Sequence, residues 1–211
     1  MPFALLAPKA PLAAQQPSFV IMPKAAVVAQ ARPFSQQFTI VDQFETRWRY
    51  RMEPALAWGA LVETPTPYKS LGIRIEMSEA GKSEITKAGN SDGPPTYGEV
   101  SARVRVASAA AIFQPEKYCW GSVCPRLIGG AGIKRYDFEG DLLWDDVRER
   151  FAGDQSRTTI QLGAGVIAYA SRLAIIAEVV DYSNSIMFAS ADNRTNRVHD
   201  LAFTLGAGVR F

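Results

Sequence analysis

Two cysteines and one histidine are the side chains with the clearest capacity for chemistry in this 211-residue chain. The cysteines lie in the segment Tyr118-Cys-Trp-Gly-Ser-Val-Cys-Pro125 and could form a redox centre, a metal site or a disulfide. Structural zinc requires about four ligands, and no second cysteine pair or histidine cluster is present to supply them. A disulfide between Cys119 and Cys124, formed in an oxidising compartment, therefore explains the pair better.

His199 is the only imidazole, so it is the only histidine that could serve as a catalytic base. It lies in Arg197-Val-His-Asp-Leu201, where no serine stands two residues further on to form a catalytic His-Ser pair with it. The alternation of this segment places His199 on the same side as its apolar neighbours. We therefore assign no catalytic, cofactor-binding or metal-binding residues, and we expect no cofactor and no enzymatic activity.

The composition excludes two classes of protein. The 23 Lys and Arg residues nearly balance 21 Asp and Glu residues, so there is no basic field of the kind that attracts nucleic acid. The longest stretches without a charged residue, 10–23 and 158–171, have fourteen residues each, whereas a membrane-spanning helix needs about 20 apolar residues. Spanning strands are not excluded, because their apolar residues alternate with polar ones.

The first 32 residues are rich in Ala, Pro and Gln. Ala29-Gln-Ala31 fits a small-residue cleavage site of an export signal, but Pro8 and Lys9 interrupt the apolar core that such a signal requires. The segment is thus either a degraded signal peptide or a disordered leader. We expect residues 1–32 to be this leader and residues 33–211 to form one domain.

From about residue 34 onward, apolar and polar residues alternate with the period of a β-strand. In residues 157–170, for example, Ile160, Leu162 and Ala164 share one face, opposite Thr159 and Gln161. Patterns of this kind predict eight strands, near 34–43, ending near Glu63, and at 69–79, 97–106, 126–139, 157–170, 171–183 and 200–211. Short and long connections alternate, which predicts an up-and-down antiparallel sheet with two unlike ends.

The polar faces of these strands indicate which side is enclosed. They carry many glycines: Gly130, Gly132, Gly163, Gly165, Gly206 and Gly208. An eight-stranded barrel has room only for side chains, so glycines inside would make space for long charged neighbours. About ten residues of a tilted strand also cover the ~25 Å apolar band of a membrane barrel. The fold class expected is all-β, an eight-stranded antiparallel up-and-down transmembrane β-barrel.

Charged residues on the polar faces are then expected in the lumen. They are Arg74, Glu76, Glu99, Arg103, Arg105, Lys134, Glu178 and Arg210. They could line an ion path or interlock as a plug, and the plug is favoured because an unpaired buried charge is costly. Tyr136, Phe138 and Tyr182, near strand ends, are typical of an aromatic girdle.

The end of the chain resembles the C-terminal assembly signal of bacterial outer-membrane β-barrels. In Asp200-Leu-Ala-Phe-Thr-Leu-Gly-Ala-Gly-Val-Arg-Phe211 the residues of the signal are Phe203, Leu205, Ala207, Val209 and Phe211. The segments Ile128-Gly-Gly-Ala-Gly-Ile-Lys-Arg-Tyr-Asp-Phe138 and Gln161-Leu-Gly-Ala-Gly-Val166 are similar to strands of small OmpA/OmpX-like barrels. This resemblance implies a bacterial outer-membrane location, lipid around the barrel and insertion by the barrel-assembly machinery. It does not imply one activity.

Three functions are consistent with these patterns. The first is an integral outer-membrane barrel with a structural or surface-interaction role through its extracellular loops, its lumen filled by charged side chains. The second is a narrow porin-like channel for small solutes. The third is a soluble lipocalin-like barrel that binds a ligand with its apolar face inside. We expect no nucleic-acid partner, and the sequence does not identify a surface partner.

Overall fold

The computed structural model describes residues 19–30, 34–39, 45–68, 70–89, 100–140, 155–187 and 195–211. Its strands are β1 (Val20–Gln30), β2 (Phe34–Thr39), β3 (Glu45–Met52), β4 (Ala55–Pro65), β5 (Leu71–Gly89), β6 (Val100–Phe113), β7 (Val123–Gly140), β8 (Gln155–Ala170), β9 (Leu173–Met187) and β10 (Thr195–Arg210). A short 3-10 helix, η1 (Glu116–Tyr118), lies between β6 and β7. None of the helices in the described residues is long and apolar enough to cross a membrane.

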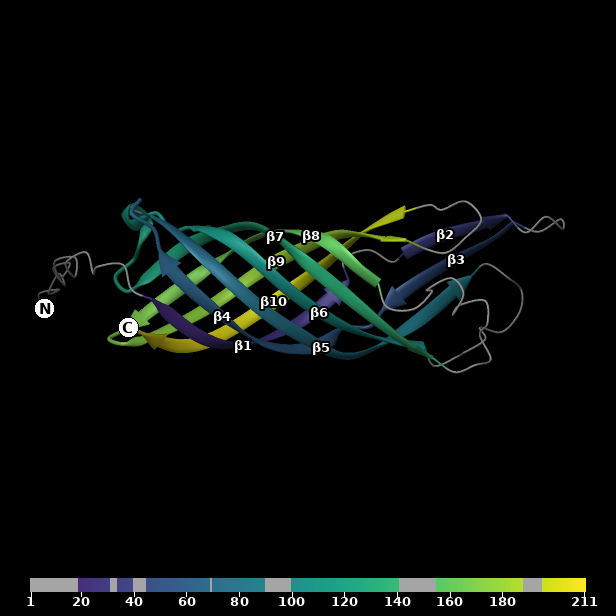
Figure 1. Ribbon diagram of the computed structural model, residues 1–211, viewed down its shortest axis with the longest axis horizontal. Coiled ribbons are helices and arrows are strands. Elements are labelled where there is room, and N and C mark those ends of the chain that lie inside the picture. The colour runs from purple at the N-terminus through teal and green to yellow at the C-terminus, as the bar shows by residue number, and fades with distance from the viewer. Residues whose placement is uncertain are drawn as a thin grey trace, which may run out of the picture.

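Eight of these strands close into an antiparallel barrel. Hydrogen bonds join them in the order β1, β4, β5, β6, β7, β8, β9, β10, and β10 pairs with β1 to complete the circle. Apart from the β2–β3 hairpin, each strand lies beside its neighbour in the chain, as Figure 1 shows. The expected eight-stranded up-and-down barrel is confirmed.

The barrel has two unlike ends. Both termini of the described chain lie at one end, which we call the turn end, together with the connections between β4 and β5, β6 and β7, and β8 and β9 (Figure 1). At the other end, the loop end, β3 pairs with residues 85–89 of β5 and β2 pairs with β3. This hairpin continues the wall beyond the closed barrel.

The first barrel strand is not where the sequence analysis placed it. The strand that closes the barrel is β1, which lies within the expected leader, whereas the region near 34–43 contributes β2 of the outer hairpin. The barrel therefore begins before residue 33. Residues 1–18 lie outside the described part of the chain, so the leader stays a prediction for them. The residues Val20 and Met22 of β1 face the lumen and are apolar, like the residues of β1 that face outward. This part of the strand therefore lacks the alternation of apolar and polar residues.

The strands of one wall are longer than the sequence analysis predicted. β5 runs to Gly89 instead of ending near residue 79, and β6 runs to Phe113 instead of ending near residue 106. The register between β5 and β6 shifts between Ala80 and Ser83, where a bulge changes which residues of β5 face inward. At about 3.3 Å per residue, the 19 residues of β5 extend well beyond a ~25 Å apolar band.

A belt of large apolar side chains covers the outside of the barrel towards the turn end. Each strand of the barrel contributes to it, through Ile21, Val27, Leu56, Trp58, Leu71, Ile73, Ile75, Met77, Phe113, Leu127, Ile133, Ile160, Leu162, Leu173, Ile175, Val179, Phe203, Leu205 and Val209. We call these residues the apolar belt. Leu205 and Met77 are both 66% exposed. The side chains that alternate with the belt are enclosed, as the sequence analysis expected for most strands.

Two apolar clusters close the lumen above and below its charged centre. At the turn end, Val20, Met22, Leu61, Ile167 and Ile176 pack together. Towards the loop end, a larger cluster is made of Ala26, Met52, Ala57, Ala80, Ala102, Val104, Val106, Ala110, Ile128, Tyr136, Val180, Tyr182, Val198 and Ala202, with Phe138 packed against it. Tyr136, Phe138 and Tyr182 thus fill the lumen and do not form the expected outer girdle.

Candidate functional site

The lumen between the two apolar clusters holds a network of six charged side chains. We call Lys24, Glu63, Arg74, Glu76, Arg126 and Glu178 the lumen network. They extend inward from β1, β4, β5, β7 and β9, and each is buried. Three cations face three carboxylates, so the network is electrically balanced. Balance is required because an unpaired charge in such an interior costs several kcal/mol, about 3–5 when one partner is removed.

Arg74 is the centre of the network. Its Nε and Nη2 atoms donate to Oε1 of Glu63 at 3.0 and 2.7 Å, and its Nη1 and Nη2 atoms donate to Oε2 and Oε1 of Glu178 at 2.8 and 2.6 Å. The planar guanidinium thereby joins carboxylates from β4 and β9 across the barrel. Charge-assisted contacts of this kind are the stronger hydrogen bonds in proteins, so Arg74 ties together walls that are not neighbours.

Arg126, on β7, contacts the same two carboxylates. Its Nη2 atom donates to Oε1 of Glu63, and its Nε atom lies 3.2 Å from Oε1 of Glu178. The Arg126 side chain is completely enclosed. Two arginines and two glutamates from β4, β5, β7 and β9 therefore form a compact group that fills the cross-section of the lumen.

Glu76 connects this group to three further strands. Lys24 donates to its Oε2 atom at 3.0 Å, and the hydroxyls of Tyr182 and Ser108 donate to Oε1, the latter at 3.2 Å. Ser108 also lies 2.9 Å from Oε1 of Gln161. The polar layer thus reaches from β1 to β9 around the barrel, with a partner on β6 and on β8.

Glycine makes the central contact possible. Gly165 on β8 lies between Arg126 on β7 and Glu178 on β9 in one cross-strand row. A Cβ atom at Gly165 would come within 2.7 Å of Glu178 Cγ and 2.4 Å of the Ala177 carbonyl oxygen. The missing side chain lets the two long neighbours meet above β8, as the sequence analysis expected of lumen glycines.

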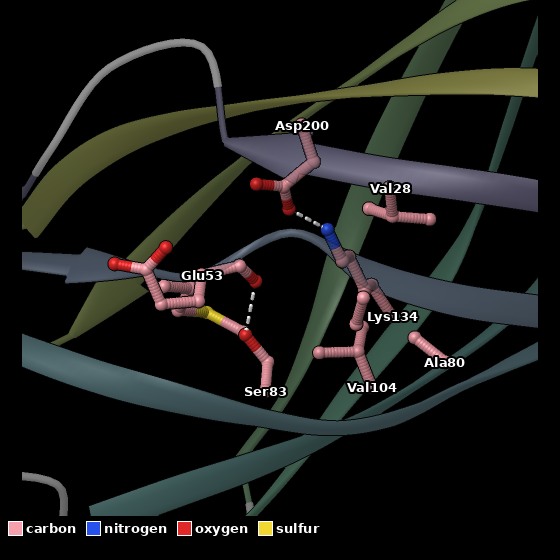
Figure 2. Close-up of a pocket in the computed structure, with 9 residues that line it drawn as sticks. Val28, Glu53, Ala80, Ser83, Val104, Lys134 and Asp200 are labelled. Carbon is pink, nitrogen blue, oxygen red and sulfur yellow. Dashed lines mark hydrogen bonds and ion pairs between the residues drawn. The ribbon is translucent and has the colours of Figure 1, made fainter.

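A further ion pair, which does not belong to the lumen network, lies nearer the loop end. Lys134 on β7 contacts Asp200 on β10, and the Tyr136 hydroxyl donates to Asn184 Oδ1 at 3.0 Å. Figure 2 shows Lys134 and Asp200 beside a small cavity that Val28, Ala80 and Val104 also line. This cavity and a neighbouring one have volumes of about 20 Å³ each, which is room for about one water molecule.

The structure distributes the charged residues expected in the lumen over several places. Arg74, Glu76 and Glu178 belong to the lumen network, and Lys134 pairs with Asp200. Arg210 lies at the turn end, 5.2 Å from the ring centre of Tyr169. Glu99 lies outside the described residues.

Arg103 and Arg105 were assigned to the wrong face. They lie on the outside of β6, where both contact Glu79, while Val104 and Val106 face the lumen. The physical reason is the environment of this part of β6, which lies beyond the apolar belt. There the β6 side chains that face the lumen pack in its apolar cluster and those on the outer surface are polar, so the alternation of this segment is reversed.

The sequence analysis missed four lumen residues that take part in ion pairs: Lys24, Glu63, Arg126 and Asp200. Lys24 lies in the segment taken for a leader, and Glu63 and Arg126 lie close to strand ends. One signal was available for Arg126. It shares the inward alternation of Ile128, Gly130, Gly132 and Lys134.

The cysteines and the histidine have structural surroundings. Cys119 and Cys124 form a disulfide between the turn that follows η1 and the start of β7, as expected. His199 faces outward, and its Nδ1 atom lies 2.9 Å from Asp181 Oδ2. The described residues contain no group of three His, Cys, Asp or Glu side chains that could hold a metal ion.

The residues of the expected assembly signal lie on the outer face of β10, except Phe211, which follows the last residue of the strand. Phe203, Leu205, Ala207, Val209 and Phe211 are all exposed, while Thr204 and Gly206 face the lumen. The last strand therefore presents a continuous apolar stripe. Recognition of this stripe by the barrel-assembly machinery stays a prediction.

Solved structures share this architecture. The outer membrane protein OprG from Pseudomonas aeruginosa is 14% identical, with 92% of this chain and 96% of that chain covered and a TM-score of 0.61. Neisserial surface protein A (NspA) is 15% identical, with 92% and 97% covered and a TM-score of 0.52. No protein-family model matches the sequence, and no curated protein matches it. At this identity the likeness shows the fold, which is that of the small eight-stranded outer-membrane β-barrels.

Proposed function

We propose that this chain is an integral protein of the bacterial outer membrane, without enzymatic activity, that acts as a structural or surface-interaction protein through the loops of its loop end. The observation that carries this proposal is the apolar belt around a barrel whose centre is charged. Lipid solvates such a belt, and a polar, enclosed interior is typical of small outer-membrane barrels.

The soluble alternative conflicts with the direction of the side chains. A lipocalin-like barrel keeps its apolar face inside and its charged face in water. Here Ile75 is 62% exposed on β5, while its neighbour Arg74 is 1% exposed. An apolar surface that circles the molecule would promote aggregation in water, whereas it matches hydrocarbon.

The lumen supports a plug over a channel. The charge-balanced lumen network lies between two apolar clusters, and the described cavities of about 20 Å³ each do not form a path for a hydrated solute. Conduction would require the ion pairs of Arg74 and Arg126 to separate. We therefore propose that the charged side chains close the barrel and hold its walls together.

Membrane lipid and the barrel-assembly machinery are the partners that follow from this proposal. The apolar stripe of β10 supports recognition during insertion, because Phe203, Leu205 and Val209 all face outward. A surface partner would meet the loop end, where the β2–β3 hairpin and the long strands extend beyond the belt. Solved relatives in fold include a protein named for the neisserial surface, which is consistent with such a role.

Two measurements test the proposal. The full chain expressed in a Gram-negative host is fractionated, and the outer-membrane fraction is run on SDS gels with and without boiling. A folded barrel in that fraction migrates differently when it is not boiled, and a boiling-insensitive protein in the soluble fraction would contradict the proposal. Planar-bilayer recordings then separate the plug from the channel, because a stable unitary conductance in the unmodified protein would favour the channel.

A further inference from the structure

A group of polar side chains lies inside the barrel on the loop side of the lumen network. We call Lys134, Tyr136, Arg157, Asn184 and Asp200 the mouth cluster, and they extend inward from β7, β8, β9 and β10. All but Arg157 are buried, and Arg157 is partly buried. Arg157 stands near the start of β8, at the loop end of that strand. The cluster therefore lies towards the opening of the lumen.

The register brings Arg157 next to Lys134 and Asn184. Arg157 is the direct cross-strand partner of Lys134, so both side chains extend from the same face of the sheet. Thr159, two residues along β8, is the partner of Asn184, which makes Arg157 and Asn184 diagonal neighbours. Diagonal neighbours lie about 7–8 Å apart, within reach of a long side chain. Three adjacent strands thus place N–H donors on one part of the lumen wall.

The charges of the mouth cluster do not balance. Lys134 forms an ion pair with Asp200, whereas Arg157 takes part in no ion pair with a described residue. Its hydrogen bond to Gln155, from Nη2 to Oε1, is long at 3.4 Å. Two cations thus share one carboxylate, and like charges at direct cross-strand positions repel. A further negative charge would be stabilised beside Arg157.

Two buried donor atoms of the cluster have no hydrogen-bond partner among the described residues. They are Nε of Arg157 and Nδ2 of Asn184. The Asn184 amide is held through its other atom, because Oδ1 accepts from the Tyr136 hydroxyl at 3.0 Å. Buried donors in folded proteins are nearly always satisfied by protein, water or a bound ion. One guanidinium donor and one amide donor are therefore free to bind a ligand.

The unpartnered donors deeper in the lumen have different surroundings. Arg126 Nη1 and Gln161 Nε2 also lack a described partner, but both residues belong to the polar layer around the lumen network. The Arg126 side chain is fully enclosed, and two glutamates supply its countercharge. Arg157 is partly exposed and contacts no described carboxylate. A ligand from outside is thus expected at Arg157 and not at Arg126.

We propose that the mouth cluster binds the carboxylate group of a small monocarboxylic acid that enters from the loop end. A single negative charge neutralises the excess of +1, whereas a dianion would leave a net negative charge in an enclosed site, which is costly. The two oxygens of a carboxylate can accept from Arg157 Nε and Asn184 Nδ2 together, and guanidinium groups match carboxylates in geometry. This inference goes beyond the proposed function, because a plugged barrel requires no ligand.

The space in the mouth of the lumen limits the ligand to a few heavy atoms. Figure 2 shows Lys134 and Asp200 beside a cavity of about 20 Å³, which has room for about one water molecule. The lumen network closes the barrel below the cluster. The acid is therefore bound at the mouth and does not pass through, and acetate is the suitable probe.

The direct test follows the side-chain Nε–Hε signal of Arg157 by ¹⁵N NMR. The folded full-length chain in a neutral detergent is titrated with sodium acetate in place of sodium chloride, at constant ionic strength. We expect the signal to shift and to saturate. Asn184→Leu keeps the arginine but removes the amide donor, and it should weaken acetate binding about tenfold. An Arg157 signal that does not respond to acetate, or equal binding by Asn184→Leu, would overturn the proposal.

A stability measurement separates a binding role of Arg157 from a structural one. Arg157→Met removes an unpaired charge from an enclosed site, so in chloride this variant should unfold at a higher urea concentration than the unmodified protein. Acetate should raise the unfolding midpoint of the unmodified protein, because a ligand of the folded state stabilises it, and should leave that of Arg157→Met unchanged. If Arg157→Met unfolds at a lower urea concentration in chloride, the arginine is structural and the proposal is wrong.

The matched control is Arg103→Gln, which removes an arginine from the outer surface of β6. Its response to acetate should equal that of the unmodified protein. Sulfate, a dianion, should shift the Arg157 signal less than acetate does, and an equal or larger shift would contradict a carboxylate site. None of these measurements depends on membrane location, so the proposed function would survive a negative result here.

Discussion

Removal of Arg126 from the lumen tests the role of the lumen network most sharply. In Arg126→Met, Glu63 and Glu178 lose one of their two cationic partners, and the network changes from three cations and three carboxylates to two and three. The side chain is fully enclosed, so water cannot replace it without opening the barrel. Breaking a buried ion pair costs about 3–5 kcal/mol, and we expect the free energy of unfolding to fall by that amount.

A second substitution should partly restore the balance. In Arg126→Met with Glu63→Gln, two cations face two carboxylates, so the double variant should be more stable than the sum of the single effects predicts, by about 2 kcal/mol. The assay is urea unfolding in lipid vesicles, followed by the gel shift of the unboiled protein. In planar bilayers, Arg126→Met should also leak, with a preference for cations because the lumen carries a charge of −1.

The matched control is Arg105→Ala, which removes an arginine from the outside of β6. Its conductance should equal that of the unmodified protein. A loss of less than 1 kcal/mol in Arg126→Met, or strict additivity in the double variant, would refute the reasoning that the network is a coupled unit.

Further predictions concern glycine, the disulfide and the belt. Gly165→Ala should destabilise the barrel by about 1–3 kcal/mol, since its Cβ would lie 2.4 Å from a backbone oxygen, whereas Gly129→Ala meets only Leu162 at 3.8 Å and should be tolerated; the unfolding midpoints of the two variants check this. Replacing both cysteines with serine should lower the free energy of unfolding by about 2 kcal/mol, because the disulfide closes a short loop. If reducing conditions leave the midpoint of unfolding in guanidinium chloride unchanged, this prediction is wrong. Leu205→Arg should cost about 2–4 kcal/mol in vesicles. Ser156→Arg, which is paired with Arg135 beyond the belt residue Ile133, should cost about 0–1 kcal/mol. Equal losses would contradict the placement of lipid at the belt.

The second half of the barrel was predictable from sequence because its strands alternate cleanly. In β8, for example, Ile160 and Leu162 face outward while Thr159 and Gln161 are buried. These strands lie within the belt for most of their length, so one face meets an apolar environment and the other a polar one. The alternation of apolar and polar residues in the sequence reveals this contrast directly.

β1 and the loop half of β6 could not be predicted by the same rule. In β1 the lumen residues Val20 and Met22 belong to the apolar cluster at the turn end, so both faces are apolar and Pro23 further weakens the pattern. In β6, Val104 packs in the apolar cluster of the lumen while Arg103 is outside. A pattern identifies two unlike faces, but it does not tell which of them is enclosed when both environments change along the strand.

The partners within the lumen network depend on the cross-barrel geometry. Arg74 and Glu178 are 104 residues apart in the chain, and their contact follows from closure of the barrel and from the space above Gly165. Alternation indicates that both side chains point inward. It carries no information on which inward charges meet.

The central claim is that the belt of large apolar side chains faces lipid and that the faces are reversed beyond it. Nitroxide labels at Leu205, Arg103 and Val104 of the protein in vesicles test it by collision with oxygen, which concentrates in hydrocarbon, and with a water-soluble nickel chelate. We predict that the label at Leu205 meets oxygen, the label at Arg103 meets the chelate, and the label at Val104 meets neither freely. A label at Leu205 that meets the chelate, together with one at Val104 that meets oxygen, would contradict the account.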